Sequence, residues 1–127
     1  MTYVVCASAH GSPGVSSAVQ LIASTWPNQQ ADPTSVPVVV EVDPTGGVLA
    51  ARYELAVSPG IVTLAESLRK SENPPLIDHA QRLPSGVACV PISASATAAA
   101  TQLRSAAPYM GPYFRHAGQP VLSLIHI

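Results

Sequence analysis

The residues best suited to chemistry form the turn HGSPGVSS at 10–17, which lies between an apolar run and a helix-like segment. Gly11 and Gly14 can adopt backbone conformations that turn main-chain N–H groups toward a bound anion. In the phosphate-binding pattern G-x-x-x-x-G-K-[ST], a lysine bonds the phosphates and a hydroxyl binds Mg²⁺. Here Val15 stands in the lysine position and Ser16 in the hydroxyl position. The turn therefore predicts a phosphate-binding loop at a helix N-terminus. This loop lacks the lysine that such loops usually contain.

Two acidic residues, Glu41 and Asp43, lie at the end of the apolar run 37–42 and precede the turn Pro-Thr-Gly-Gly. In an open α/β sheet, ligands bind at the carboxyl ends of the strands. A carboxylate there can hold Mg²⁺ through water or orient an attacking water. Asp43 has an alternative role, because Asp-Pro sequences often cap the turn that follows them. The residues alone leave both roles open.

A set of alternating strands and helices must position these motifs. Three valine-rich runs without clean alternation are typical of buried parallel strands: residues 3–9, 37–42 and 86–92. Four stretches have helical patterns: residues 16–25, 58–70, 74–86 and 93–107. The alternation predicts an α/β fold with a doubly wound, mostly parallel sheet that has helices on both faces.

Serines and prolines mark the expected ends of these elements. Ser58 is the predicted cap of the second helix, and Ser93 or Ser95 is the predicted cap of the last one. Two proline-containing stretches, 27–37 and 107–120, are predicted as loops.

The composition narrows the class of protein. Hydrophobic residues make up 47% of the chain and charged residues only 10%, with a mean hydropathy of +0.28. No uninterrupted apolar run reaches the length of about 18 residues that a membrane span needs, and the N-terminus has no basic segment of a signal peptide. We therefore expect a cytoplasmic protein. The net charge is −1 and the basic residues are dispersed, so neither DNA binding nor membrane contact is predicted for this segment.

The cysteines and histidines do not form a metal-binding pattern. Cys6 and Cys89 lie inside apolar strand-like runs and are expected to be buried thiols. The four histidines, at positions 10, 79, 116 and 126, are far apart in the sequence.

The last six residues, LSLIHI at 122–127, are interpreted separately. They correspond to an in-frame translation of a transposon-end adapter that is used to build sequencing libraries, so a non-native tail is expected. Residues 1–121 are then the N-terminal part of a single, incomplete domain. A genuine terminal strand is the alternative, because the composition of the segment also suits a strand.

Taken together, the two motifs resemble the ParA/MinD family of P-loop switch ATPases, whose deviant Walker A motif reads K-G-G-x-G-K-[ST]-[ST]. The second strand of that family ends in D-x-D-P-x-G. The corresponding stretches are HGSPGVSS at 10–17 and EVDPTGGVLAARY at 41–53. They are most similar to a bacterial branch with the loop K-G-S-P-G-V-T-T and the second motif E-x-D-P-x-G-G-x-L-A-A-R. In that branch valine already occupies the lysine position.

The resemblance implies a role for each matching position. ATP and Mg²⁺ are the expected cofactors, and the residues placed around the nucleotide are His10, Gly11, Ser12, Pro13, Gly14, Val15, Ser16 and Ser17. Ser16 would contact Mg²⁺, and Ser17 would lie near the α-phosphate. Asp43 would position the lytic water and hold Mg²⁺ directly or through water, with Glu41 as a weaker metal contact. His10 occupies the position of the signature lysine that reaches across a nucleotide-bound homodimer.

Departures from the family pattern leave hydrolysis open. Both motif lysines are absent, and a neutral histidine at position 10 is a poor substitute for a lysine. The first hypothesis is an ATP-dependent switch for chromosome partitioning, septum placement or positioning of surface machinery, with slow or absent hydrolysis. The second is a pseudo-ATPase scaffold that acts through contacts with an unknown protein partner. A third is another doubly wound domain, such as a receiver-like module, although the first strand ends without an acidic residue.

Overall fold

Five strands form one mixed sheet in the computed structural model, which describes residues 3–8, 14–27, 29, 31–32 and 35–126. The strands are β1 (Tyr3–Ser8), β2 (Val38–Glu41), β3 (Gln81–Arg82), β4 (Ala88–Val90) and β5 (Val121–His126). Their order in the sheet is β1-β5-β2-β4-β3. Strands β1, β5, β2 and β4 are parallel to one another, and β3 runs antiparallel to its neighbour β4.

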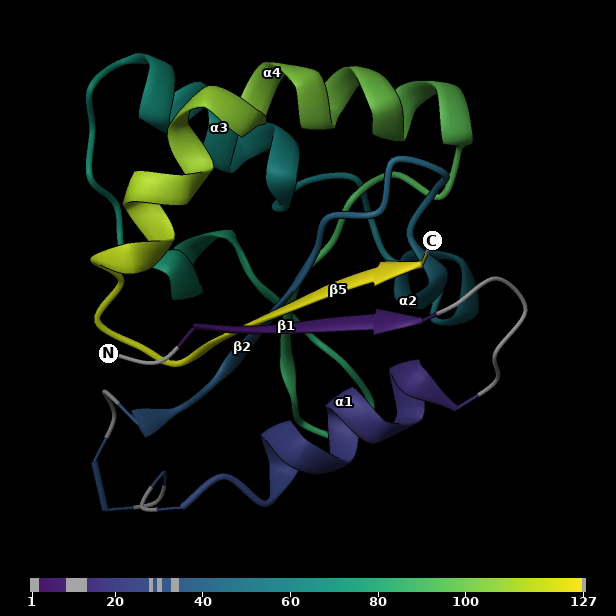
Figure 1. Ribbon diagram of the computed structural model, residues 1–127, viewed down its shortest axis with the longest axis vertical. Coiled ribbons are helices and arrows are strands. Elements are labelled where there is room, and N and C mark those ends of the chain that lie inside the picture. Colours follow the sequence, from purple (N-terminus) through teal and green to yellow (C-terminus); the bar gives the residue numbers. More distant parts are fainter. Residues whose placement is uncertain (1–2, 9–13, 28, 30, 33–34, 127) are drawn as a thin grey trace.

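Helices cover both faces of this sheet (Figure 1). One face carries α1 (Val15–Ser24) and α2 (Val48–Arg52), and the other carries α3 (Ile61–Arg69), the short 3-10 helix η2 (Leu76–His79) and α4 (Ala96–Arg115). The expected α/β class, with a mostly parallel sheet between two layers of helices, is therefore confirmed. Within the described residues, none of the helices combines the length and the apolar composition that crossing a membrane requires.

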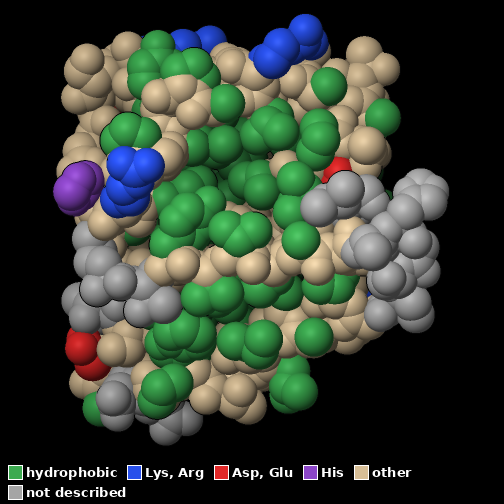
Figure 2. Space-filling model, in the orientation of Figure 1, with side chains coloured by type: hydrophobic (Ala, Val, Ile, Leu, Met, Phe, Trp, Pro, Cys, Tyr) green, Lys and Arg blue, Asp and Glu red, His purple; other side chains and the backbone are tan. Residues whose placement is uncertain are grey.

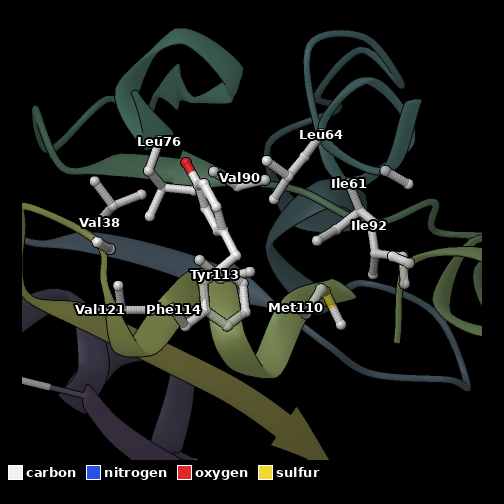
Figure 3. Packing of buried hydrophobic residues seen from close by; sticks show 14 of the residues in the cluster. Val38, Ile61, Leu64, Leu76, Val90, Ile92, Met110, Tyr113, Phe114 and Val121 are labelled. Atoms are coloured by element: carbon white, nitrogen blue, oxygen red, sulfur yellow. The ribbon is translucent and has the colours of Figure 1, made fainter. Parts of the chain in front are cut away.

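Strand β2 explains why the sequence shows no alternation. Val38 and Val40 belong to the core beneath α3 and α4, whereas Val39 belongs to the core beneath α1. All three side chains are fully buried, as expected for a parallel strand covered on both sides. Figure 3 shows Val38, Val90, Leu64, Tyr113 and Phe114 gathered in the first of these cores.

Residues 122–126, which were expected to belong to a non-native tail, form most of β5 in the interior of the sheet. The strand pairs with β1 on one side and with β2 on the other. Leu122 and Leu124 are buried against the α1 face. An apolar strand of suitable length fits this position whatever its origin, so the pairing leaves the origin of the segment as a prediction.

The prediction of one helix over 74–86 is wrong. The segment instead contains η2, the short strand β3 and a turn closed by a hydrogen bond of 2.8 Å from the Gly86 N–H to the Leu83 carbonyl. Leu76 is buried on the α3–α4 face, while Leu83 is buried on the α1 face. The segment must therefore pass around the edge of the sheet, which a single helix could not do.

The prediction of a loop over 107–120 is wrong for residues 107–115, because α4 continues to Arg115 through two prolines, whereas residues 116–120 do connect α4 to β5 outside helices and strands. Pro108 and Pro112 lie on the exposed side of the helix. Met110 and Phe114 are buried against the sheet, and that burial outweighs the loss of two helical hydrogen bonds. The C-terminal half of α4 bends toward the sheet (Figure 1), as prolines inside a helix commonly cause.

One of the predicted caps is present in the structure, one is not, and one helix was not predicted. Ser95 caps α4 as expected and accepts a hydrogen bond from the Ala98 N–H. Ser58 does not cap α3, which begins after Gly60. The Gly60 N–H donates to the Thr63 hydroxyl over 3.1 Å, so a threonine inside the helix takes the place of the expected serine cap. Helix α2 has no counterpart among the predicted elements.

Candidate functional site

The phosphate-binding motif is described from Gly14 onward, and His10, Gly11, Ser12 and Pro13 lie outside the described residues. Gly14 has a φ of 92°, a left-handed conformation that strongly favours glycine. Its carbonyl accepts the first bond of α1 from the Ala18 N–H at 2.8 Å. The glycine therefore turns the chain directly into the helix.

The first turn of α1 presents polar backbone groups at its N-terminus. The N–H groups of Val15, Ser16 and Ser17 have no acceptor inside the helix, as in every α-helix. Ser16 is 4% exposed, and Val15 is half-buried against the core of the α1 face. The position that usually holds a lysine is thus part of the packing of α1.

Asp43 is buried and organises the turn after β2. Its Oδ1 atom accepts hydrogen bonds from the Thr45 N–H at 2.9 Å and from the Thr45 hydroxyl at 2.6 Å. Its carbonyl accepts the Gly46 N–H at 3.2 Å. The alternative that Asp43 caps this turn is therefore confirmed. One carboxylate oxygen carries these contacts with Thr45.

Glu41 is 1% exposed and lies at the N-terminus of α2. Its Oε2 atom accepts the Leu49 N–H at 3.0 Å, and its Oε1 atom accepts the Ala50 N–H at 3.1 Å. Burial raises the pKa of Glu41 from 4.5 to about 7, although the two N–H donors oppose the increase. The carboxylate positions α2 against the sheet, and both of its oxygens are used for this purpose.

Gly46 and Gly47 allow the turn to approach its neighbours closely. A Cβ atom on Gly47 would lie 2.7 Å from both the Glu41 Oε1 atom and the Ile92 carbonyl. The Gly47 N–H donates to the Ser93 carbonyl at 2.9 Å. Gly46 has a φ of 113°. The residues DPTGG therefore link the end of β2 to the segment after β4.

Parallel pairing brings the carboxyl ends of β1, β5, β2 and β4 to one edge of the sheet. The start of α1 and the short helix α2 lie at this edge in Figure 1. Asp43 follows β2, and Gly14 leads from β1 into α1. Because β5 separates β1 from β2, the two strands are about 10 Å apart. The structure brings both predicted motifs to the same edge, with one strand between them.

Of the predicted metal ligands at this edge, some are suited to holding Mg²⁺ and one is not. No group of three or more histidine, cysteine, aspartate or glutamate side chains in the described residues could hold a metal. Mg²⁺ in phosphate sites needs only one or two protein ligands, since phosphate and water complete its shell. Ser16 and Asp43 have the oxygen donors for this role. Glu41 does not fit, because backbone N–H groups occupy both of its oxygens.

Three surface hollows lie away from Gly14 and Asp43. One, of about 310 Å³, lies at the amino ends of β2 and β4 and includes Pro37 and Ala88. The other two, of about 350 and 460 Å³, share Asn73, Tyr113 and His116 beside the C-terminal half of α4. These hollows do not coincide with the predicted nucleotide site.

Comparison with known proteins finds no match to a family model, a curated protein or a solved structure. The assignment of a function therefore depends on the residues and their geometry. Thr45 and Gly47, which hold the acidic turn together, are not among the site residues that the sequence predicts. The signal that could have identified them is the dense turn chemistry of Asp-Pro-Thr-Gly-Gly, in which an acidic acceptor is followed within four residues by two glycines.

Proposed function

We propose that the chain is a nucleotide-dependent switch protein of the ParA/MinD type that binds ATP weakly and hydrolyses it slowly or not at all. The observation that supports this most is the left-handed Gly14 at the start of α1, at the same sheet edge as Asp43. Main-chain N–H groups at a helix N-terminus form a general anion-binding arrangement. The P-loop identity of the fold is part of this proposal.

In this proposal the backbone of the loop is the main phosphate ligand. The N–H groups of Val15, Ser16 and Ser17 would donate to phosphate oxygens, and the Ser16 hydroxyl would contact Mg²⁺. Asp43 would hold the ion directly or through water and would orient an attacking water. Bound Mg²⁺ supplies positive charge that offsets the charge of the phosphates. Glu41 would act indirectly, by fixing α2 and the turn that carries Asp43.

Valine at position 15 determines how tightly we expect the chain to bind ATP. A hydrogen bond to a charged group contributes about 1.5–3 kcal/mol, so its absence lowers affinity by about ten- to a hundredfold. The half-buried Val15 side chain packs on the core beneath α1 and offers the phosphates no hydrogen bond. Weak ATP binding is the result we expect. Dimerisation would then follow nucleotide binding.

A second candidate is a scaffold that retains the fold and acts through protein contacts alone. The hydrogen bonds of Glu41 and Asp43 support it, because they give the acidic motif a structural role that needs no nucleotide. In this case the function would not require the two lysines that the motif lacks.

Calorimetric titration with ATP and millimolar Mg²⁺ tests the proposal, using the whole chain and three variants. We expect weak binding by the wild type and binding that is about ten- to a hundredfold tighter in Val15→Lys. Asp43→Asn keeps an oxygen that can accept from Thr45 but removes the charge, so it should weaken the Mg²⁺-dependent part of binding. Asp78→Asn is the matched control, because it removes one exposed carboxylate on η2.

The two candidates predict different results. Absence of ATP and ADP binding by both the wild type and Val15→Lys would contradict the switch proposal and favour the scaffold. Equal affinity in Asp43→Asn and Asp78→Asn would contradict the metal role of Asp43.

A further inference from the structure

Gln20 is a buried amide that joins three segments of the chain on the α1 face of the sheet. It is 9% exposed and lies in the second turn of α1. Its Nε2 atom donates to the Tyr53 hydroxyl at 3.2 Å, and its Oε1 atom accepts from the Ser85 hydroxyl at 3.1 Å. The Tyr53 hydroxyl also donates to the Oε1 atom at 3.4 Å. Side chains 33 and 65 residues away in the sequence thus satisfy a polar group that burial would otherwise penalise.

Tyr53 connects this amide to α2. The residue follows α2 directly, and its N–H donates to the Leu49 carbonyl at 3.0 Å. At the other end of the helix, the Glu41 carboxylate accepts from the Leu49 and Ala50 N–H groups. Helix α2 is therefore attached to β2 at its start and to α1 at its end. With five residues and a rise of about 1.5 Å per residue, it is a short connection between the two.

Each end of this connection lies next to one of the predicted Mg²⁺ ligands. Gln20 follows Ser16 by four residues, so the two side chains lie on the same face of α1, one turn apart. Both are buried. Glu41 precedes Asp43 by two residues at the end of β2. A path of hydrogen bonds and helix backbone therefore joins the two predicted ligands.

Helix α1 packs on the sheet through apolar side chains. Val19 and Ala23 belong to the core that also contains Leu122 and Leu124, and residues 1–31 contain no aspartate, glutamate, lysine or arginine. Figure 2 shows hydrophobic side chains across the middle of this view of the molecule, while charged side chains lie toward its margins. Apolar contacts are not directional, whereas hydrogen bonds have a preferred length and angle. The hydrogen bonds of Gln20 therefore help to determine where α1 lies relative to α2.

We propose that Tyr53 is a positioning residue of the predicted Mg²⁺–nucleotide site and that it fixes the separation of Ser16 and Asp43. This role rests on the proposed function, in which both residues hold the ion. Mg²⁺ requires near-ideal geometry, so it is bound tightly only when its ligands lie at suitable distances from one another. Without the Tyr53 hydroxyl, α1 and α2 would keep their apolar packing, but their relative position would vary. The ion would then lose the benefit of two ligands that are already in place.

Calorimetric titration of Tyr53→Phe with ATP, with and without Mg²⁺, tests this proposal. We expect the variant to lower the gain in ATP affinity that Mg²⁺ provides by about tenfold, at the lower end of the effect of residues that orient metal ligands. Affinity for ATP without Mg²⁺ should stay unchanged, because α1 alone then contacts the phosphates. A purely structural role would weaken binding equally with and without the ion.

Ser85→Ala is the matched control for this titration. It removes another hydrogen bond to the same Gln20 amide but leaves the connection to α2 in place. The gain in affinity from Mg²⁺ should therefore keep its wild-type value. Both substitutions are measured in the wild-type chain and in Val15→Lys, whose higher expected affinity makes the difference easier to measure.

Hydrogen exchange without nucleotide gives a second measurement. The N–H groups at positions 51 and 53 donate to the Gly47 and Leu49 carbonyls and report on the opening of α2. They should exchange faster in Tyr53→Phe than in the wild type, because α2 loses its attachment to α1. In Ser85→Ala they should exchange at the wild-type rate.

The outcomes separate this proposal from the proposed function. Absence of ATP binding by both the wild type and Val15→Lys would overturn the proposed function, and the positioning role with it. If ATP binds, equal Mg²⁺ dependence in Tyr53→Phe and Ser85→Ala would overturn the positioning role alone. Unchanged exchange of α2 in Tyr53→Phe would do the same.

Discussion

At the scale of single residues, the acidic motif after β2 combines a structural role with a candidate chemical one. Glu41 caps α2, Asp43 holds its own turn through Thr45, and Gly47 leaves room for the Glu41 carboxylate. The three positions depend on one another, because a Cβ on Gly47 would lie within 3.0 Å of both Glu41 oxygens. The motif thus specifies the geometry of this sheet edge even before a ligand is considered.

Glu41 should make stability depend on pH. Its pKa is about 7 in the folded chain, raised from 4.5 mainly by burial. The folded state therefore binds a proton more tightly than the unfolded state, and this contribution is lost as the pH rises from about 4.5 to about 7. We expect Glu41→Gln to gain about 2 kcal/mol in unfolding free energy relative to the wild type between pH 5 and pH 8.

Urea denaturation at several pH values measures this difference. The comparison must be made against the wild type, because His79 contributes with the opposite sign. Burial lowers the pKa of His79, so its contribution is lost as the pH falls. Glu66→Gln, which removes an exposed carboxylate, should follow the wild-type profile. Parallel profiles for Glu41→Gln and the wild type would show that Glu41 does not take up a proton on folding.

At the scale of elements, α4 depends on tertiary contacts that its own sequence does not suggest. Its last turns contain Pro112 and are nevertheless helical, because Met110, Tyr113 and Phe114 are buried. Tyr113 also donates a hydrogen bond of 2.6 Å to the Pro74 carbonyl, which joins α4 to the segment before η2. Packing and this polar contact together hold the helix end in place.

We expect Tyr113→Phe to lower the unfolding free energy by about 1 kcal/mol or more, because it leaves the half-buried Pro74 carbonyl without this donor. Tyr109→Phe is the control, since Tyr109 is on the same helix and 40% exposed. Thermal and urea unfolding of both variants measure the effect. Equal stability of the two variants would mean that the Tyr113 hydroxyl does not contribute to the docking of α4.

At the scale of the whole molecule, β5 connects the two halves of the sheet. It is the only link between β1 and β2 among the described strand pairings. Its Leu122 and Leu124 side chains complete the core beneath α1, and Val121 belongs to the core beneath α4. The fold therefore depends on residues 122–126, which belong to the segment that the sequence predicts to be a non-native tail.

Removal of residues 122–127 should abolish cooperative folding, because β1 would lose its described strand partner and the core beneath α1 would lose Leu122 and Leu124. Circular dichroism and urea denaturation would measure the loss. As a control, Leu122→Val with Leu124→Val should fold with a cost of about 1 kcal/mol at each position, since an apolar strand remains. A truncated chain that still unfolds cooperatively would contradict the role of β5.

The amino-acid sequence by itself determined the elements whose patterns are local. Valine-rich runs specified the cores of β1, β2 and β4, and the Ser95 cap marked the start of α4. The same local chemistry made a turn one of the two roles open to Asp43, and the contacts with Thr45 that form this turn are local. The α/β class followed from the alternation of these elements.

Only the tertiary structure decided the features that depend on contacts distant in sequence. The insertion of β5 between β1 and β2, the continuation of α4 through Pro108 and Pro112, and the capping of α2 by Glu41 are of this kind. The last two involve a local cost, a missing helical N–H or a buried carboxylate, that packing against another element offsets. A pattern along the chain indicates the local preference, whereas the fold reflects the local preference together with the contacts between distant residues.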